Sequence, residues 1–385
     1  MKLAVFSDHG IGRYFAQLFD NIPEATFFIS EKNKSGLNVT QHPRYFLSER
    51  NQILHILKAP HKAWKRLKEN DSDRKRDFHY FEIEEAAAQG KFDIALTAAE
   101  RSLYTLASLK AKGAKFKLIY WVPFTIPFVD MFVARSMNIR EFAFPHIDHF
   151  VAITRTCADT LKFEGIDPQR ITHIYPGIDL KSFKPPSPLP PNDSNGFHIL
   201  FVGKLVSWKG CYTLLYATKL LKDRIPGLRI TLIGRGAQRD GLERAATLLG
   251  IADRISLPGF FPYDEMPNFY TQADVFVLPA LPAINLAEQF GFVVAEAMAC
   301  GLPTVVSRVG GLPEVVDNNA DLLFTPGDYH ELAERLLAIY ENQQLHKKLS
   351  TWCLERACTH YDAHKNGEAL RSCLFTVHKQ QTVGC

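Results

Sequence analysis

Several features that would place this chain in a specialised class are missing from its 385 residues. No run of apolar residues approaches the ~18 needed to span a bilayer. Seven cysteines are scattered without paired spacing, which predicts reduced thiols rather than a disulfide framework. The formal net charge is only +4, and so small a surplus does not indicate nucleic-acid binding. These absences favour a cytoplasmic globular protein, and the length allows two domains with sizeable cores.

We also expect no repeats, no signal peptide and no metal site. No internal repeat at solenoid spacing stands out, and the only biased tract is the Pro-rich segment 184–193. Residues 2–6 are typical of a strand rather than a signal peptide, because polar residues follow at once. His146, Asp148 and His149 are the nearest approach to a metal set. Neighbouring strand residues point to opposite faces, so we expect no metal there.

Small residues dominate the stretch from Glu288 to Gly301, which is typical of a loop that turns into a helix. Gly291 permits backbone geometry that a side chain would forbid. Gly301 followed by Pro303 ends the helix. The free amides at the helix start, around residues 291–294, would favour an anion such as a phosphate.

Two carboxylates bracket those amides, Glu288 before them and Glu296 after them. A carboxylate accepts hydrogen bonds from vicinal hydroxyls, so sugar rings are suitable partners. We interpret the stretch as a nucleotide-sugar site, in which Glu288 holds the sugar, the amides hold the pyrophosphate and Glu296 holds the ribose. The alternative is that Glu296 caps a helix and Glu288 is solvated, and spacing alone leaves both open.

The spacing of Glu288 and Glu296, with a Phe-Gly pair between them, resembles the Glu-x7-Glu signature of retaining family 4 glycosyltransferases, glycosyl transferases group 1. The likeness continues through residues 303–306 and 310–316 and covers most of 145–330. It implies the GT-B fold, an α/β architecture of two Rossmann-like, doubly wound domains that face each other across a cleft. The donor would bind chiefly to the second domain and the acceptor to the first.

The strand and helix patterns, read with this resemblance, predict the domain limits. Residues 1–180 form the acceptor-side Rossmann-like domain, and residues 181–196 form a Pro-rich linker. Residues 197–364 form the nucleotide-sugar-binding domain. The family architecture would return the helix in 365–385 to the first domain. Between the strand expected at 26–29 and residue 90, the sequence is polar and weakly patterned.

Two lysines complete the expected diphosphate site. The segment from Gly203 to Gly210 resembles the family segment whose two basic side chains bind the donor diphosphate, and Lys204 and Lys209 occupy those positions. The departing diphosphate gains charge in the transition state, so cations aimed at it lower the barrier. Surface lysines are the alternative, but cations at a helix start oppose its dipole unless an anion binds there.

The resemblance and the turn patterns together give the predicted site. Glu288, Lys209 and Lys204 are the catalytic candidates. The predicted donor-binding residues are Gly203, Lys204, Lys209, Arg235, Gly259, Phe260, Glu288, Phe290, Gly291, Phe292, Val293 and Glu296. Gly10, Gly12 and Trp121 are expected to line the cleft, although the two glycines could equally form only a tight turn. Trp121 begins a segment in which many relatives carry a histidine, and the absence of a histidine here suggests an aromatic cleft wall.

The function implied by the resemblance is a retaining hexosyltransferase. It would move a hexose from a nucleotide diphosphate sugar to an unidentified acceptor hydroxyl, and family habit suggests a polysaccharide or glycolipid precursor. The leaving phosphate would help to deprotonate the acceptor in a front-face attack, so no metal or cofactor is expected. Two rivals stay open: a GT-B epimerase and a non-catalytic protein that binds a nucleotide-sugar.

A basic segment, Lys62–Lys68, is the remaining functional candidate. After Pro60 it is typical of an amphipathic helix with Trp64 and Leu67 on one side. Such a helix can lie on an anionic membrane surface or attract a lipid-linked acceptor, which would place the protein at the inner face of the membrane. The alternative is a solvated helix anchored by Trp64.

Overall fold

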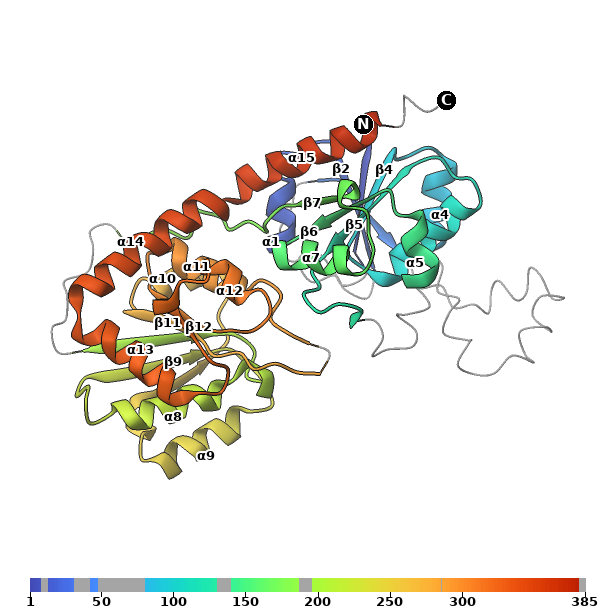
Figure 1. Ribbon diagram of the computed structural model, residues 1–385. Coiled ribbons are helices and arrows are strands. Elements are labelled where there is room, and N and C mark those ends of the chain that lie inside the picture. Colours follow the sequence, from blue (N-terminus) through green and yellow to red (C-terminus); the bar gives the residue numbers. More distant parts are fainter. Residues whose placement is uncertain are drawn as a thin grey trace, which may run out of the picture.

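The computed structural model of the chain describes residues 1–7, 13–30, 42–47, 80–129, 140–186, 196–284 and 286–380. Within these residues the chain forms two α/β domains, each built on one parallel sheet (Figure 1). The predicted fold class, two Rossmann-like doubly wound domains, is confirmed. Gly10, Gly12 and the Lys62–Lys68 segment lie outside the described residues, so the predictions for them stay predictions.

The first domain holds a seven-stranded sheet in the order β3-β2-β1-β4-β5-β6-β7. Its strands are β1 (Leu3–Ser7), β2 (Ala25–Ser30), β3 (Arg44–Leu47), β4 (Ile94–Thr97), β5 (Lys117–Val122), β6 (His149–Ala152) and β7 (Ile171–His173). All neighbours pair in parallel. The central strands are apolar and buried on both faces, as parallel sheets require.

The helices of the first domain are α1 (Arg13–Ala16), α4 (Phe81–Ala88), α5 (Glu100–Ala111) and α7 (Arg155–Phe163). Helix α1 passes at once into a 3₁₀ turn, Gln17–Phe19. Helix α7 begins after Thr154, whose hydroxyl accepts a hydrogen bond from the Cys157 amide over 3.0 Å. This is an N-cap of the ordinary kind.

The second domain holds a six-stranded parallel sheet in the order β10-β9-β8-β11-β12-β13. Its strands are β8 (Phe197–Val202), β9 (Leu228–Ile233), β10 (Ile255–Gly259), β11 (Val275–Leu278), β12 (Thr304–Ser307) and β13 (Leu323–Phe324). Its helices are α8 (Cys211–Leu221), α9 (Arg239–Leu249), α10 (Met266–Tyr270), α11 (Phe292–Ala299), α12 (Leu312–Val315), α13 (Tyr329–Glu341) and α14 (Gln343–His360).

The order of the second sheet reverses between β8 and β11, since β9 and β10 continue to one side and β12 and β13 to the other. In open α/β sheets, ligands bind beyond the carboxyl ends of the strands at such a switch point. The loop after β8 carries Gly203 to Lys209, and the chain after β11 leads to Glu288. The topology therefore brings both predicted donor segments to one edge of the sheet.

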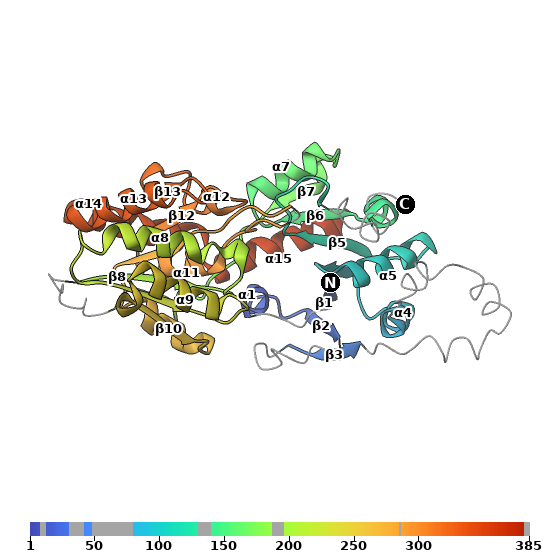
Figure 2. The same ribbon diagram turned by 90° about the horizontal axis from the view of Figure 1, so that it is seen from below.

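The last helix, α15 (Ala363–Lys379), leaves the second domain and runs along the first (Figure 1; Figure 2). There, Arg371 donates to Glu24 over 2.7 Å. The close approach of α15 to the 3₁₀ turn requires Gly367, because a Cβ at that position would lie 2.4 Å from the Leu18 carbonyl oxygen. Among the helices of the described ranges, none has both the length and the apolarity to cross a membrane.

Candidate functional site

Lys209 and Glu288 form a buried ion pair at the switch point. Lys209 ends a 3₁₀ turn, Ser207–Lys209, just after β8. Its ammonium donates to Oε2 of Glu288, and the two side chains are only 10% and 13% exposed. The ammonium also lies 4.6 Å from the centre of the Trp208 ring. Burial makes each charge depend on its partner, because a buried charge left alone is costly.

The loops after β8 and β9 pack backbone against backbone. A Cβ at Gly234, whose φ is 147°, would lie 1.8 Å from the Gly203 carbonyl oxygen, so glycine is required. The Gly203 amide donates to the Ile233 carbonyl over 2.9 Å. This contact fixes the backbone from which Lys204 and Arg235 extend, and both side chains are exposed. Arg235 lies 5.3 Å from the ring centre of Phe260, which is itself 59% exposed.

Helix α11 begins where the sequence predicted an anion site. Gly291 adopts a left-handed conformation with φ 79° and precedes the first helical residue. The Val294 amide donates back to the Gly291 carbonyl over 2.9 Å. Of the predicted amides, those of Phe292 and Val293 have no hydrogen-bond partner among the described residues. These two N–H groups are thus available to an anion.

Glu296 lies deep in the structure rather than at an open surface. It is 1% exposed, and the Tyr270 hydroxyl donates to its Oε2 over 2.6 Å. Burial raises the pKa of Glu296 to about 7, although hydrogen bonds from Tyr270 and Tyr14 act to lower it. The expected contact between Glu296 and a ribose stays a prediction, and in this conformation it requires the covering side chains to move.

Part of that cover comes from the first domain. Tyr14, in α1, stacks on Phe292 with ring centres 4.3 Å apart, and its ring meets that of Tyr263 edge-on at 5.4 Å. Beside it, Arg13 pairs with Asp264 of the second domain. The start of α11 is therefore an interdomain contact as well as a candidate anion site.

Two predicted site residues, Trp121 and Phe290, have buried side chains. Trp121 is 6% exposed and meets Phe15 edge-on at 5.5 Å. Its ring packs between β5 and α1, and its expected place in the cleft wall stays a prediction. Phe290 is 1% exposed and packs against Tyr361 at 5.3 Å. Its predicted donor contact could involve only its backbone. Gly259, with φ 96°, has nothing near its Cβ position and leaves the loop before Phe260 open.

Sequence reasoning missed the tyrosines around Glu296. Tyr14 lies more than 240 residues before Tyr263 and Tyr270 in the chain, and no spacing rule connects the three. Single tyrosines on short helices carry no signal of their own. The signal that could have found them is the buried position of Glu296, because a buried carboxylate requires hydroxyl or amide donors.

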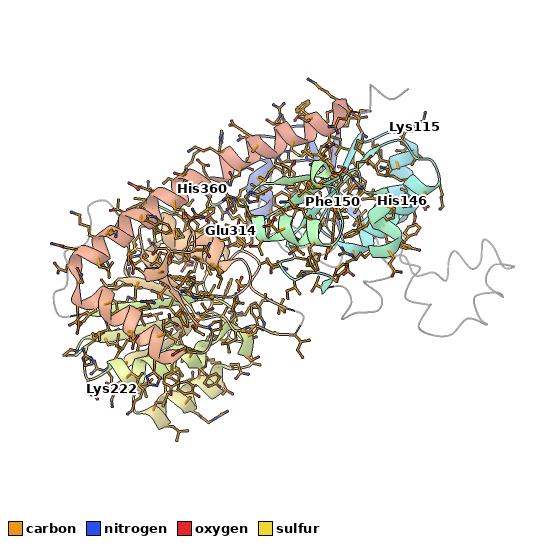
Figure 3. All side chains as sticks on the ribbon, viewed as in Figure 1. Lys115, His146, Phe150, Lys222, Glu314 and His360 are labelled. Carbon is orange, nitrogen blue, oxygen red and sulfur yellow. The ribbon has the colours of Figure 1, made fainter. Side chains whose placement is uncertain are left out.

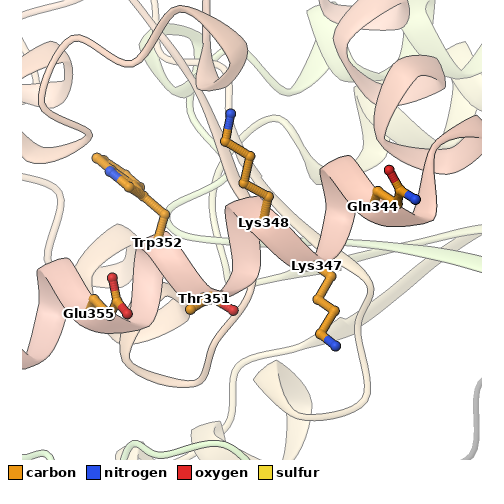
Figure 4. Close-up of a pocket in the computed structure, with 6 residues that line it drawn as sticks. All are labelled: Gln344, Lys347, Lys348, Thr351, Trp352 and Glu355. Atoms are coloured by element: carbon orange, nitrogen blue, oxygen red, sulfur yellow. The ribbon is translucent and has the colours of Figure 1, made fainter.

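In the part of the chain that the structure describes, no three His, Cys, Asp or Glu side chains gather as metal ligands. An open hollow does lie over α14 (Figure 4). It is lined by Gln344, Lys347, Lys348, Thr351, Trp352 and Glu355. All six belong to one helix, and none is a predicted donor residue, so we do not assign a function to this hollow.

Comparison with known families covers both halves of the chain. Residues 13–182 match the model described as Glycosyltransferase Family 4. Residues 189–351 match the model described as Glycosyl transferases group 1. The boundary between the two matches falls in the Pro-rich segment of the sequence.

Relatives of known name match over part of their length. The D-inositol 3-phosphate glycosyltransferase of Thermomonospora curvata is 32% identical over 236 residues, which are 55% of this chain and 53% of that protein. The protein of the same name from Thermobifida fusca is 34% identical over 196 residues, 46% of this chain and 44% of that protein. The chain spans about half the length of the curated relatives it matches.

Solved structures match over nearly the whole chain. Anabaena HepE, solved in complex with UDP, superimposes with a TM-score of 0.77 at 19% identity and covers 98% of this chain and 100% of its own. Sucrose-phosphate synthase from Thermosynechococcus elongatus gives 0.74 at 19% identity, with 99% and 100% covered. At such identity these likenesses concern the fold. The likenesses show the GT-B fold, and the two family matches show that this chain belongs to the group 1, family 4 glycosyltransferases.

Proposed function

We propose that the chain is a retaining glycosyltransferase that moves a hexose from a nucleotide diphosphate sugar to an acceptor hydroxyl. The observation that carries the proposal is the buried Lys209–Glu288 pair at the switch point. An ammonium and helix amides suit a diphosphate, and a carboxylate suits the hydroxyls of a sugar. The open amides of Phe292 and Val293 supply the remaining donors for the diphosphate.

Donor binding would separate the ion pair, and each residue would then contact a different part of the donor. Lys209 would turn from Glu288 to the diphosphate, and Glu288 would then accept hydrogen bonds from the hexose. The bond between the anomeric carbon and the diphosphate oxygen breaks as the acceptor oxygen bonds to the same face of that carbon. The acceptor proton passes to the leaving phosphate, so no protein base is needed. Lys209 stabilises the charge that develops on the diphosphate, and Glu288 stabilises the positive charge on the ring.

Exposed groups around the pair would complete the donor site. Lys204 and Arg235 would add cations to the diphosphate, and the loop at Gly259 and Phe260 would contact the base. Uridine is our first choice of base, because several structures with this fold were solved with UDP or UDP-glucose. The acceptor would be a hydroxyl of a polysaccharide or glycolipid precursor.

The test is turnover of UDP-hexoses by wild-type protein and by Lys209→Ala and Glu288→Gln. Each variant loses one preorganised charge, at the diphosphate for Lys209→Ala and at the sugar ring for Glu288→Gln, which should lower kcat by about 10²–10³-fold. The quantity measured is the UDP that is released when the hexose is transferred to water or to an acceptor sugar. Lys162→Ala is the control, because Lys162 forms only an exposed pair with Asp159 on α7, and its turnover should equal that of wild type.

The outcomes also separate the rival functions. An epimerase would convert the donor into a second nucleotide-sugar without releasing UDP. A non-catalytic binding protein would be stabilised by UDP and release no sugar with any acceptor. Equal turnover in wild type, Lys209→Ala and Glu288→Gln would contradict the proposed roles of both residues.

A further inference from the structure

One carboxylate of the second domain binds the first domain directly. Glu314 lies in α12, and Figure 3 shows it at the junction of the two domains. Its Oε1 accepts from the Arg155 amide over 2.7 Å and from the Tyr175 hydroxyl over 2.8 Å. Its Oε2 accepts from both the amide and the hydroxyl of Thr156, each over 2.9 Å. All four donors belong to the first domain.

These contacts place a negative charge on the first two amides of α7. Thr154 already caps the third amide of this helix, from Cys157, so Glu314 supplies the remaining acceptors from across the domain junction. Burial acts to raise the pKa of Glu314, but the hydrogen bonds from Thr156, Arg155 and Tyr175 together hold the pKa below its ordinary value. The carboxylate is thus charged at neutral pH, and its hydrogen bonds are of the stronger, charge-assisted kind.

The segment that carries Glu314 also supports the backbone of Glu288. The Gly311 amide donates to the Glu288 carbonyl over 2.8 Å. A Cβ at Gly310 would lie 2.0 Å from that same oxygen, and one at Gly311 would lie 3.5 Å from the Thr154 side chain. Residues 310–314 therefore contact Glu288 at one end and α7 at the other.

Arg356 of α14 and Tyr361, which follows it, donate hydrogen bonds to the backbone at the end of the same segment. Arg356 donates to the carbonyls of Glu314 and Val315, each over 2.7 Å. The Tyr361 hydroxyl also donates to Val315 over 2.7 Å. With its backbone fixed at these points, the segment has little freedom to move independently of Glu288 when the first domain changes position.

We propose that Glu314 is a positioning residue. It docks α7 of the first domain on the segment that supports Glu288, and so fixes the position of Glu288 when the two domains close. The proposal rests on the proposed function for the role of Glu288, but the docking itself does not. It predicts that loss of the carboxylate slows the chemical step while the donor, held chiefly by the second domain, still binds.

The test compares Glu314→Gln with Glu331→Gln. Glu331 is a suitable control because it also accepts a backbone amide, that of Thr325 over 2.7 Å, but its contacts stay within the second domain. We expect Glu314→Gln to lower kcat by about three- to thirtyfold and to change the Kd of UDP by less than about twofold. Glu331→Gln should match wild type in both. Equal kcat in wild type and Glu314→Gln, or an equal loss in the control, would overturn the proposal.

A second variant tests the same contact from the first domain, so that a folding defect in Glu314→Gln cannot be mistaken for loss of the contact. Thr156→Val removes one of the four hydrogen bonds from the first-domain side, so it should lower kcat in the same direction by less. In the double variant with Glu314→Gln it should add less than it does alone, because the uncharged side chain at 314 has already weakened the hydrogen bond that both changes affect. Additive losses in kcat would contradict a shared contact and overturn the proposal.

Small-angle scattering separates this inference from the proposed function. Without donor, Glu314→Gln should show a larger radius of gyration than wild type and Glu331→Gln, since it weakens a charged contact between the domains. Unchanged scattering would overturn the docking whatever the turnover. If the wild type neither binds UDP nor transfers sugar, the proposed function fails, and the scattering still decides whether Glu314 holds the domains together.

Discussion

Two glutamates of one short stretch occupy opposite environments. Glu288 pairs with the ammonium of Lys209. Glu296, further along the chain in α11, accepts a hydrogen bond from the Tyr270 hydroxyl on one oxygen, and its other oxygen lacks a hydrogen-bond partner among the described residues. A charge with a buried counter-ion stays ionised, whereas a charge that has lost its water without a cation is disfavoured. The same residue type is therefore suited to different roles at the two positions.

The environment of Glu296 predicts a stability that falls as pH rises. Burial raises the folded pKa to about 7, from an ordinary value of 4.5. Between these values the folded protein holds a proton that the unfolded chain has released, so the free energy of unfolding decreases as pH increases. The full decrease, reached above pH 7, is at most about 3 kcal/mol for such a shift.

Chemical denaturation at pH 5 and pH 8 checks this prediction. Glu296→Gln removes the charge but keeps an oxygen for Tyr270, so it should lose less stability than wild type between the two pH values. Glu243→Gln, at an exposed i,i+4 pair with Arg239, should follow wild type. An identical pH dependence in wild type and Glu296→Gln would mean that the carboxylate ionises normally in the folded protein.

At the scale of elements, the turn from Gly310 to Gly311 fixes the position of Glu288. Gly310→Ala would place a Cβ 2.0 Å from the Glu288 carbonyl at a φ of 56°, so the backbone must shift. Such a strained, overpacked site should cost about 2–4 kcal/mol of unfolding free energy. Gly250→Ala shares the positive φ, at 65°, but meets only the Lys222 ammonium at 3.8 Å.

Thermal and denaturant unfolding of these two variants provide the measurement. Gly250→Ala should cost about 1 kcal/mol, since only its backbone conformation is penalised. If both variants lost the same stability, the close approach of Gly310 to Glu288 would not be the cause. Gly310→Ala should also turn over donor more slowly, because the displaced carbonyl belongs to Glu288.

Local sequence patterns predict these elements to different degrees. The β1 strand and α11 follow from buried runs and small-residue helical spacing, so the sequence reveals the switch-point segments. The edge strand β3 (Arg44–Leu47) was not predicted, because four residues with no alternation carry too little signal. The contact of Glu314 with Thr156 joins residues 158 apart. A single sequence offers no rule that pairs them, although Glu314 falls in the segment that resembles the family.

At the scale of the whole molecule, contacts between the domains gather around the start of α11. Tyr14 stacks on Phe292, Arg13 pairs with Asp264, and Glu314 binds the start of α7. The candidate anion site and the contacts between the domains thus share one region. A donor that enters here must displace the Tyr14 cover from Glu296 if the ribose is to reach that carboxylate. Donor binding and domain position are therefore expected to be coupled.

The most direct measurement of the central claim is a crystal structure of the protein with bound UDP. We predict the β-phosphate between the Lys209 ammonium and the amides of Phe292 and Val293, with Glu288 released from its ion pair. Phosphates bound away from Lys209 and α11, with the Lys209–Glu288 pair intact, would contradict it.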